Sequence, residues 1–208
     1  MSILGKFAGP VLKPLRHFHH RRSYSKSRNF VLRRFTRHSI GAEIGVWKGE
    51  FSAQILEVVQ PKKLHLIDPW KYQSSSEFSN AFYGGAIGGG QQNMDNIHRS
   101  VIEKFRQEIA NGVVDVNRGP SDRIVEEFPD NYFDWVYVDG DHRYEGALKD
   151  LELYHSKLKS RAIVAGDDYA NAGLWWGDGV IRAVGEAVRK GWYKDLVVKY
   201  NQFIIVKA

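Results

Sequence analysis

Short β-rich segments alternate with helical patterns from residue 40 to the end of the chain. The strand candidates are residues 40–46, 63–67, 113–117, 135–138 and 162–165, followed by a closing pair at 195–200 and 202–207. Helical patterns separate them at residues 50–59, 94–110, 122–127, 144–158 and 179–190. This alternation predicts an α/β fold: a doubly wound, mostly parallel sheet of about seven strands, with helices on both faces and an antiparallel C-terminal hairpin at one edge.

The size and composition of the chain fit this fold. With 208 residues, of which 43% are hydrophobic and 26% charged, it is long enough for one soluble globular domain. The absence of Cys excludes disulfides, thiolate metal sites and cysteine nucleophiles. No apolar run approaches the roughly 18–20 residues that a membrane span needs. We therefore expect a cytoplasmic protein without a transmembrane segment.

Basic residues are concentrated at the N-terminus. Residues 1–40 contain ten Lys or Arg and no acid, whereas the rest of the chain carries 20 basic and 24 acidic side chains. The asymmetry predicts a basic, partly helical N-terminal extension over residues 1–37, followed by a domain over residues 38–208. An amphipathic helix near the domain is the preferred interpretation. A weak membrane-surface contact, a nucleic-acid contact and an organelle transit peptide are the alternatives.

Polar residues and glycines gather at the carboxyl ends of the predicted strands, where ligands bind in a doubly wound sheet. In chain order they are Glu43, Gly45, Gly49, Asp68, Trp70, Arg118, Ser121, Asp139, Asp141, His142, Asp167 and Asp168. Carboxylates at one sheet edge would repel one another unless cations, hydroxyls or amines lay between them. The pattern therefore predicts a ligand site at this edge.

The residues around the first two strands narrow the class of ligand. Gly45 and Gly49 permit a tight turn and a close approach to backbone N–H groups at a helix N-terminus. The chain contains no Gly-x-Gly-x-x-Gly, and Lys48 does not belong to a Walker-type Gly-Lys-Ser/Thr. Glu43 would also repel a pyrophosphate, whereas Asp68 is placed to accept both hydroxyls of a ribose. A ligand with a ribose and an ammonium group, but without phosphate, fits these residues.

Four segments resemble, in the correct order, the motifs of class I S-adenosylmethionine-dependent methyltransferases. They are EIGVWKGEFS (43–52), HLIDPW (65–70), VDGDHRYE (138–145) and GDDY (166–169). The nearest subgroup is related to the metal-dependent small-molecule O-methyltransferases, including sugar and catechol-type enzymes. The resemblance covers residues 38–207 and implies a Rossmann-like fold with S-adenosyl-L-methionine as cofactor. It also implies methyl transfer to a small-molecule acceptor, with a hydroxyl oxygen as the expected site of methylation.

The resemblance also implies roles for individual residues in cofactor binding. Glu43, Gly45 and Gly49 would line the methionine part of the cofactor, Asp68 would hold the ribose, and Ser121 would lie near the adenine. Val46, Trp70 and Asp139 complete the expected set of cofactor contacts. One departure is that Trp47 stands where the commonest form of the first motif has a further Gly.

Metal-dependent relatives hold a divalent cation between an acid after the fourth strand and an acidic or amide pair after the fifth. Here Asp167 and Asp168 fit the pair, and either Asp139 or Asp141 fits the third position. Carboxylate oxygens suit Mg²⁺ or Mn²⁺ better than Zn²⁺. We therefore expect Mg²⁺ as the cation if the reaction is metal-assisted, and a metal-free transfer is the alternative.

His142 and Asp141 are the candidates for the base that deprotonates the acceptor. Alternatively, His142 orients Asp139 or caps the following helix. Aromatic residues flank the same edge and would either contact the acceptor or form the core of a lid: Trp70, Tyr72, Phe82, Tyr83, Trp175 and Trp176. Gly84–Gly85 and Gly88–Gly90 make their segment a candidate mobile cover.

Two other classes of function are compatible with the sequence. The basic extension could recruit a nucleic-acid or protein substrate, in which case binding would weaken strongly with salt. The same fold could also serve a scaffold protein or a different reaction, because fold alone does not define function. A homodimer is one of the assemblies that we expect.

Overall fold

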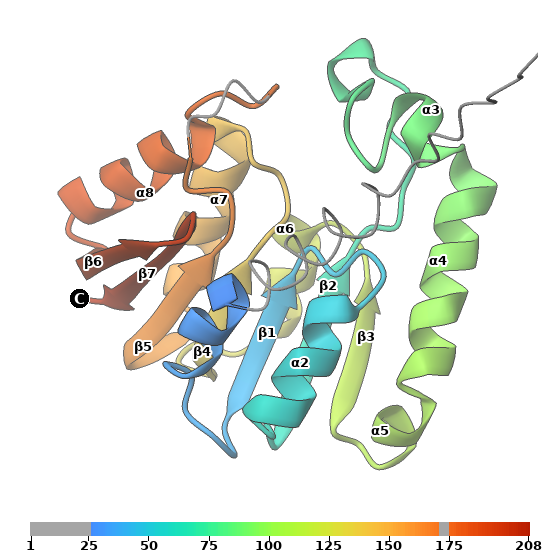
Figure 1. Cartoon of the computed structure of the whole chain (residues 1–208). Coiled ribbons are helices and arrows are strands. Elements are labelled where there is room, and N and C mark those ends of the chain that lie inside the picture. Colours follow the sequence, from blue (N-terminus) through green and yellow to red (C-terminus); the bar gives the residue numbers. More distant parts are fainter. Residues whose placement is uncertain (1–25, 171–174) are drawn as a thin grey trace, which may run out of the picture.

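The computed structural model describes residues 26–170 and 175–208 (Figure 1). These residues form one seven-stranded sheet in the order β3-β2-β1-β4-β5-β7-β6. The strands are β1 (Ile40–Ile44), β2 (Lys63–Asp68), β3 (Val114–Arg118), β4 (Phe133–Val138), β5 (Leu158–Gly166), β6 (Tyr193–Lys199) and β7 (Gln202–Lys207). Neighbours among β1 to β5 pair in parallel, whereas β7 is antiparallel to both β5 and β6. The predicted sheet and its C-terminal hairpin are confirmed.

Helices connect the strands and cover both faces of the sheet (Figure 1). They are α2 (Glu50–Val58), α3 (Gly85–Gly88), α4 (Gln91–Lys104), α5 (Arg106–Ala110), α6 (Ser121–Ile124), α7 (Tyr144–His155) and α8 (Gly179–Arg189), with 3₁₀ turns η1 (Ser76–Phe78) and η2 (Val125–Glu127). The single helix expected over 94–110 is divided at Phe105, where the backbone leaves the helical region (φ −107°, ψ 21°). The bend keeps the Phe105 ring in the core, next to Gly49.

The central strands are buried on both faces, as their apolar sequences predict. On β4, Val136 and Val138 belong to the core cluster formed with α7 and α8. Trp135 and Tyr137 belong to the opposite cluster, formed with α2, α4 and the segment before β1. Two packed faces fix the register of each central strand, and the register places the strand ends at one edge.

The segment before β1 contributes to the second of these clusters. Residues 26–32 are helical. Val31, Leu32 and Phe35 are buried, and the Phe35 ring stacks on Trp135 with centroids 4.2 Å apart. Residues 1–25 of the predicted basic extension lie outside the described residues. Within the described ranges, no helix combines the length and the apolar character needed to cross a membrane.

Because His65 of β2 is buried, we expect the free energy of unfolding of this protein to decrease in acid. Burial, opposed by Asp115, lowers the pKa of His65 from 6.5 to about 4. The unfolded chain therefore binds the proton first, so stability is complete above pH 6.5 and falls as the pH decreases towards 4. We expect His65→Gln to remove about 3 kcal/mol of this pH-dependent loss. Urea unfolding at pH 7.5 and pH 4.5 measures it, and equal losses in the parent and the variant would contradict the prediction.

Candidate functional site

A cavity of about 440 Å³ lies at the carboxyl ends of the central strands. Its lining includes Ile44, Gly45, Ile67 and Asp68 at the ends of β1 and β2, Pro120, Ser121 and Asp122 after β3, and the segment from Asp139 to Arg143 after β4. This is the edge at which doubly wound sheets bind ligands, and the volume is typical of small-molecule sites. Four predicted cofactor residues, Gly45, Asp68, Ser121 and Asp139, line the cavity.

Gly45 brings the turn after β1 against the end of β4. Its φ is +88°, and a Cβ atom there would lie 2.0 Å from the carbonyl oxygen of Asp139. The Gly45 N–H donates to the carbonyl of Ile67 (2.9 Å), which ties the turn to β2 as well. Only glycine combines this conformation with this approach. The bare backbone of the turn therefore forms part of the cavity wall.

Asp68 fixes the same turn through its carboxylate. Its Oδ2 accepts hydrogen bonds from the N–H groups of Val46 (2.9 Å) and Trp47 (3.0 Å) and from the hydroxyl of Tyr83. Its Oδ1 accepts one from the N–H of Trp70 (2.7 Å). Burial raises the pKa of Asp68, and these hydrogen bonds oppose that shift. The carboxylate predicted to hold a ribose is thus satisfied within the protein.

The structure places the other predicted cofactor residues behind the cavity wall. The Glu43 side chain is buried and accepts a hydrogen bond from the Ser52 hydroxyl (2.5 Å), and burial raises its pKa to about 8. Val46 contributes its N–H to Asp68. Gly49 allows close packing of α2 against Phe105, and buried Trp70 donates its indole N–H to the carbonyl of Trp47 (2.9 Å). These four residues are not part of the cavity lining.

Asp150, a buried carboxylate of α7, also lines the cavity, although it is not among the residues predicted from the sequence. Its Oδ1 accepts a hydrogen bond from the Ser121 hydroxyl (2.5 Å). Burial raises its pKa to about 7. A signal was present in the sequence, because Asp150 lies on the apolar face of α7 beside Ala147 and Leu151. An acid on a buried helix face needs a partner, and here that partner is a predicted site residue.

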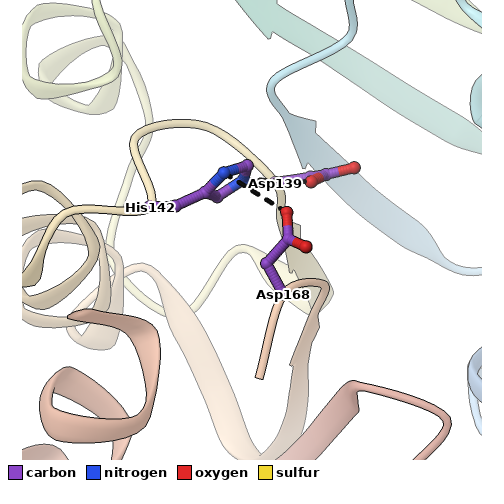
Figure 2. A group of neighbouring side chains, drawn as sticks. All are labelled: Asp139, His142 and Asp168. Carbon is purple, nitrogen blue, oxygen red and sulfur yellow. Dashed lines mark hydrogen bonds and ion pairs between the residues drawn. The ribbon is translucent and has the colours of Figure 1, made fainter. Parts of the chain in front are cut away.

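Asp139, His142 and Asp168 come together at one side of the cavity (Figure 2). Each offers one potential ligand atom, and these atoms lie within 4.8 Å of one another. The His142 ring lies between the two carboxylates, with Nε2 3.3 Å from Asp139 and Nδ1 3.3 Å from Asp168. Burial lowers the pKa of His142, but the surrounding carboxylates outweigh it and raise the pKa overall. Two carboxylates and an imidazole fit a divalent cation.

The remaining members of the predicted metal set lie differently. Asp167 is close to this group: burial, reinforced by Asp139 and Asp168, raises its pKa, and its Oδ1 accepts the Asp168 N–H (2.8 Å). Asp141 is outside the group, because its carboxylate is engaged by the Arg143 guanidinium (2.7–3.1 Å). Of the two acids predicted as the third ligand, the structure therefore brings Asp139 to His142 and Asp168, and not Asp141.

Arg28 reaches this acidic group from the helix at residues 26–32. Its guanidinium lies 3.4 Å from Asp139 and 3.8 Å from Asp167 and stacks over the Phe51 ring of α2 at 4.4 Å. The side chain is largely buried. A permanent cation thus lies beside the carboxylates that end β4 and β5, and it reduces their mutual repulsion.

The segment between β2 and α4 covers the cavity. Phe78 and Tyr83 of this segment line the cavity, and so does Trp175, which precedes α8. Arg143 stacks over the Phe78 ring at 4.5 Å and pairs with Glu77 (2.6 Å), which joins the cover to the loop after β4. Of the other predicted aromatic residues, Trp70 is buried, Phe82 stacks on Trp47 and is 64% exposed, and Trp176 lies 4.9 Å from the His142 ring. Tyr72 donates its hydroxyl to the carbonyl of Gly85 (3.1 Å).

Comparisons with known proteins identify the family of the chain. The family model of a methyltransferase domain matches residues 42–169, more than half of the chain. No curated protein matches the sequence. Solved structures match at low identity, among them a protein of Galdieria sulphuraria assigned as a sarcosine dimethylglycine methyltransferase (15% identity, TM-score 0.48). That match covers 78% of this chain, which spans about half (52%) of the length of the relative.

Two further structures are matched along most of their length. A protein of Streptococcus mutans, assigned as a methyltransferase and solved with SAH, is 14% identical at a TM-score of 0.58, with 89% of this chain and 98% of that chain covered. A protein of Staphylococcus aureus, assigned as a caffeoyl-CoA O-methyltransferase, is 12% identical at a TM-score of 0.58, with 96% and 93% covered. Such likeness shows the fold, and the family model shows the family. The chain belongs to the methyltransferase domain family, which confirms the resemblance of its four motifs to class I S-adenosylmethionine-dependent methyltransferases.

Proposed function

We propose that this protein transfers a methyl group from S-adenosyl-L-methionine to a hydroxyl oxygen of a small-molecule acceptor, with a divalent cation such as Mg²⁺ at the acceptor. The observation that carries the proposal is the group formed by Asp139, His142 and Asp168 beside the cavity that Gly45 and Asp68 line. One side of the cavity supplies the bare backbone and buried carboxylate suited to the cofactor. The other side supplies a potential base and metal ligands.

The size and cover of the cavity support a small acceptor. Its volume is typical of a small-molecule site, and Phe78, Tyr83 and Trp175 are among the residues that line it. A flat or apolar acceptor fits aromatic walls of this kind. The relative from Staphylococcus aureus is assigned as an O-methyltransferase, which agrees with oxygen as the atom methylated.

The proposed reaction is an in-line substitution at the methyl carbon. The C–O bond forms as the C–S bond breaks, the acceptor proton passes to a ring nitrogen of His142, and the products are a methyl ether and S-adenosylhomocysteine. The base is the neutral ring: its one N–H donates to Asp139 or Asp168, which orients the ring, and its other nitrogen accepts the proton. Asp139, Asp168 and the adjacent Asp167 would hold the cation. When bound, the cation would lower the pKa of the acceptor hydroxyl.

Metal binding tests this proposal without an acceptor. We expect titration of Mn²⁺ followed by electron paramagnetic resonance to show one site, and Asp139→Ala to weaken it at least about tenfold. Asp178→Ala is the matched control, because Asp178 is half exposed and pairs only weakly with Arg182 (3.9 Å). Equal Mn²⁺ affinity in the parent and Asp139→Ala would reject the metal site. Calorimetry with S-adenosylhomocysteine tests the cofactor separately, and absence of binding would reject methyl transfer from it.

A further inference from the structure

Asp68 has no surface left for a ligand. Its exposed fraction is 0%, although it belongs to the cavity lining. Three of its four hydrogen-bond donors are backbone N–H groups, those of Val46, Trp47 and Trp70. These amides belong to the turns after β1 and β2 and cannot leave without a change in the turns themselves. The fourth donor is a side chain, the hydroxyl of Tyr83.

Tyr83 lies on the segment that covers the cavity, and its side chain also lines it. The ring lies 5.0 Å from the Trp47 ring, so it is packed against the same turn that Asp68 fixes. Its carbonyl accepts the N–H of Gln73 (2.8 Å), within the cover itself. The hydroxyl is therefore brought to Asp68 by a later part of the connection that begins with the turn after β2. It can be withdrawn while the backbone hydrogen bonds of Asp68 stay in place.

We propose that the Tyr83 hydroxyl occupies the position of a ribose hydroxyl on Asp68, and that binding of the cofactor displaces it. This inference rests on the proposed function, because it requires a ligand that carries a ribose. One O–H donor replaces another, so the buried carboxylate keeps all of its hydrogen bonds before and after the exchange. Tyr83 is then a competitor of the cofactor, and the cover shifts whenever the cofactor enters.

The direction in which one substitution changes the affinity for S-adenosylhomocysteine tests the proposal. Tyr83→Phe keeps the ring against Trp47 and removes only the competing hydroxyl. We expect the dissociation constant of S-adenosylhomocysteine, measured by calorimetry, to fall about 3- to 10-fold, the range that corresponds to one net hydrogen bond. Tyr72→Phe is the matched control, because Tyr72 belongs to the same segment but donates to Gly85 and not to Asp68. We expect it to leave the dissociation constant unchanged.

A second ligand separates competition from a general loosening of the cover. An analogue of S-adenosylhomocysteine without either ribose hydroxyl cannot take the place of the Tyr83 hydroxyl. We therefore expect Tyr83→Phe to improve its binding less than twofold. Unchanged or weaker binding of S-adenosylhomocysteine by Tyr83→Phe would overturn the proposal, as would an equal gain for both ligands. If the parent protein bound neither ligand, the proposed function itself would fail, which is a distinguishable result.

Discussion

Replacing Gly45 by Ala is expected to lower the free energy of unfolding by about 3–5 kcal/mol and to abolish binding of S-adenosylhomocysteine. Two effects add. Any other residue at φ +88° is strained, and the new Cβ would lie 2.0 Å from the Asp139 carbonyl oxygen. Because that oxygen belongs to the backbone, the turn after β1 must separate from the end of β4. The separation would distort the wall of the cavity, so stability and ligand binding should fail together.

Gly112→Ala is the matched control for this experiment. Gly112 also has a positive φ (+73°), but nothing lies within 4 Å of a Cβ atom there. It should therefore show only the conformational strain, about 1–2 kcal/mol, with ligand binding intact. Urea unfolding and calorimetry measure the two quantities. Similar losses of stability in both variants would show that the contact between the turn after β1 and β4 has no energetic importance.

Replacing His142 by Gln should reduce kcat about 10²- to 10⁴-fold, the usual contribution of a positioned base. Gln can still make hydrogen bonds to Asp139 and Asp168, but it cannot accept the acceptor proton at neutral pH. In the proposed cofactor site, Gly45, Asp68 and Ser121 make the main contacts, so we expect the dissociation constant of S-adenosylhomocysteine to change less than threefold. Steady-state rates with a hydroxyl acceptor measure the effect.

His155→Gln provides the comparison for His142→Gln. His155 ends the same helix that begins after His142, and its ring lies at the carbonyl of Trp192 (3.1 Å), outside the cavity lining. Its substitution should leave kcat within twofold of the parent. Turnover by His142→Gln within tenfold of the parent would assign His142 to the orientation of Asp139, which is the alternative left open by the sequence.

The sheet could be predicted because its information is local. An apolar run such as residues 162–165 is typical of a central parallel strand wherever it occurs, and polar residues at 139 and 167 mark the strand ends. The division of the helix at Phe105 could not be predicted in this way. No Gly or Pro interrupts residues 94–110, and the bend arises because Phe105 packs beside Gly49, which lies far away in the sequence.

The part of the candidate site that the sheet topology places could be predicted for the same reason. The contacts made by the loops and by distant segments could not. Parallel strands bring Asp139 and Asp168 to one edge, so their proximity to His142 follows from the topology. The pairing of Asp141 with Arg143 depends on the local turn and on Glu77, a residue of the distant cover. Arg28 reaches the site from a separate segment through tertiary packing, and no pattern in the sequence indicates its contact with Asp139. Tyr83 was expected at this edge, but its hydrogen bond to Asp68 was not.

Arg28 lies before the first of the four motifs, yet it contacts the site. A fragment that started at residue 38 would retain all four motifs and every strand, yet it would lose the guanidinium beside Asp139 and Asp167 and the Phe35 ring that covers Trp135. Proteolytic trimming of the basic N-terminus would therefore remove this guanidinium as soon as the cut fell after Arg28, and all four motifs would still be intact.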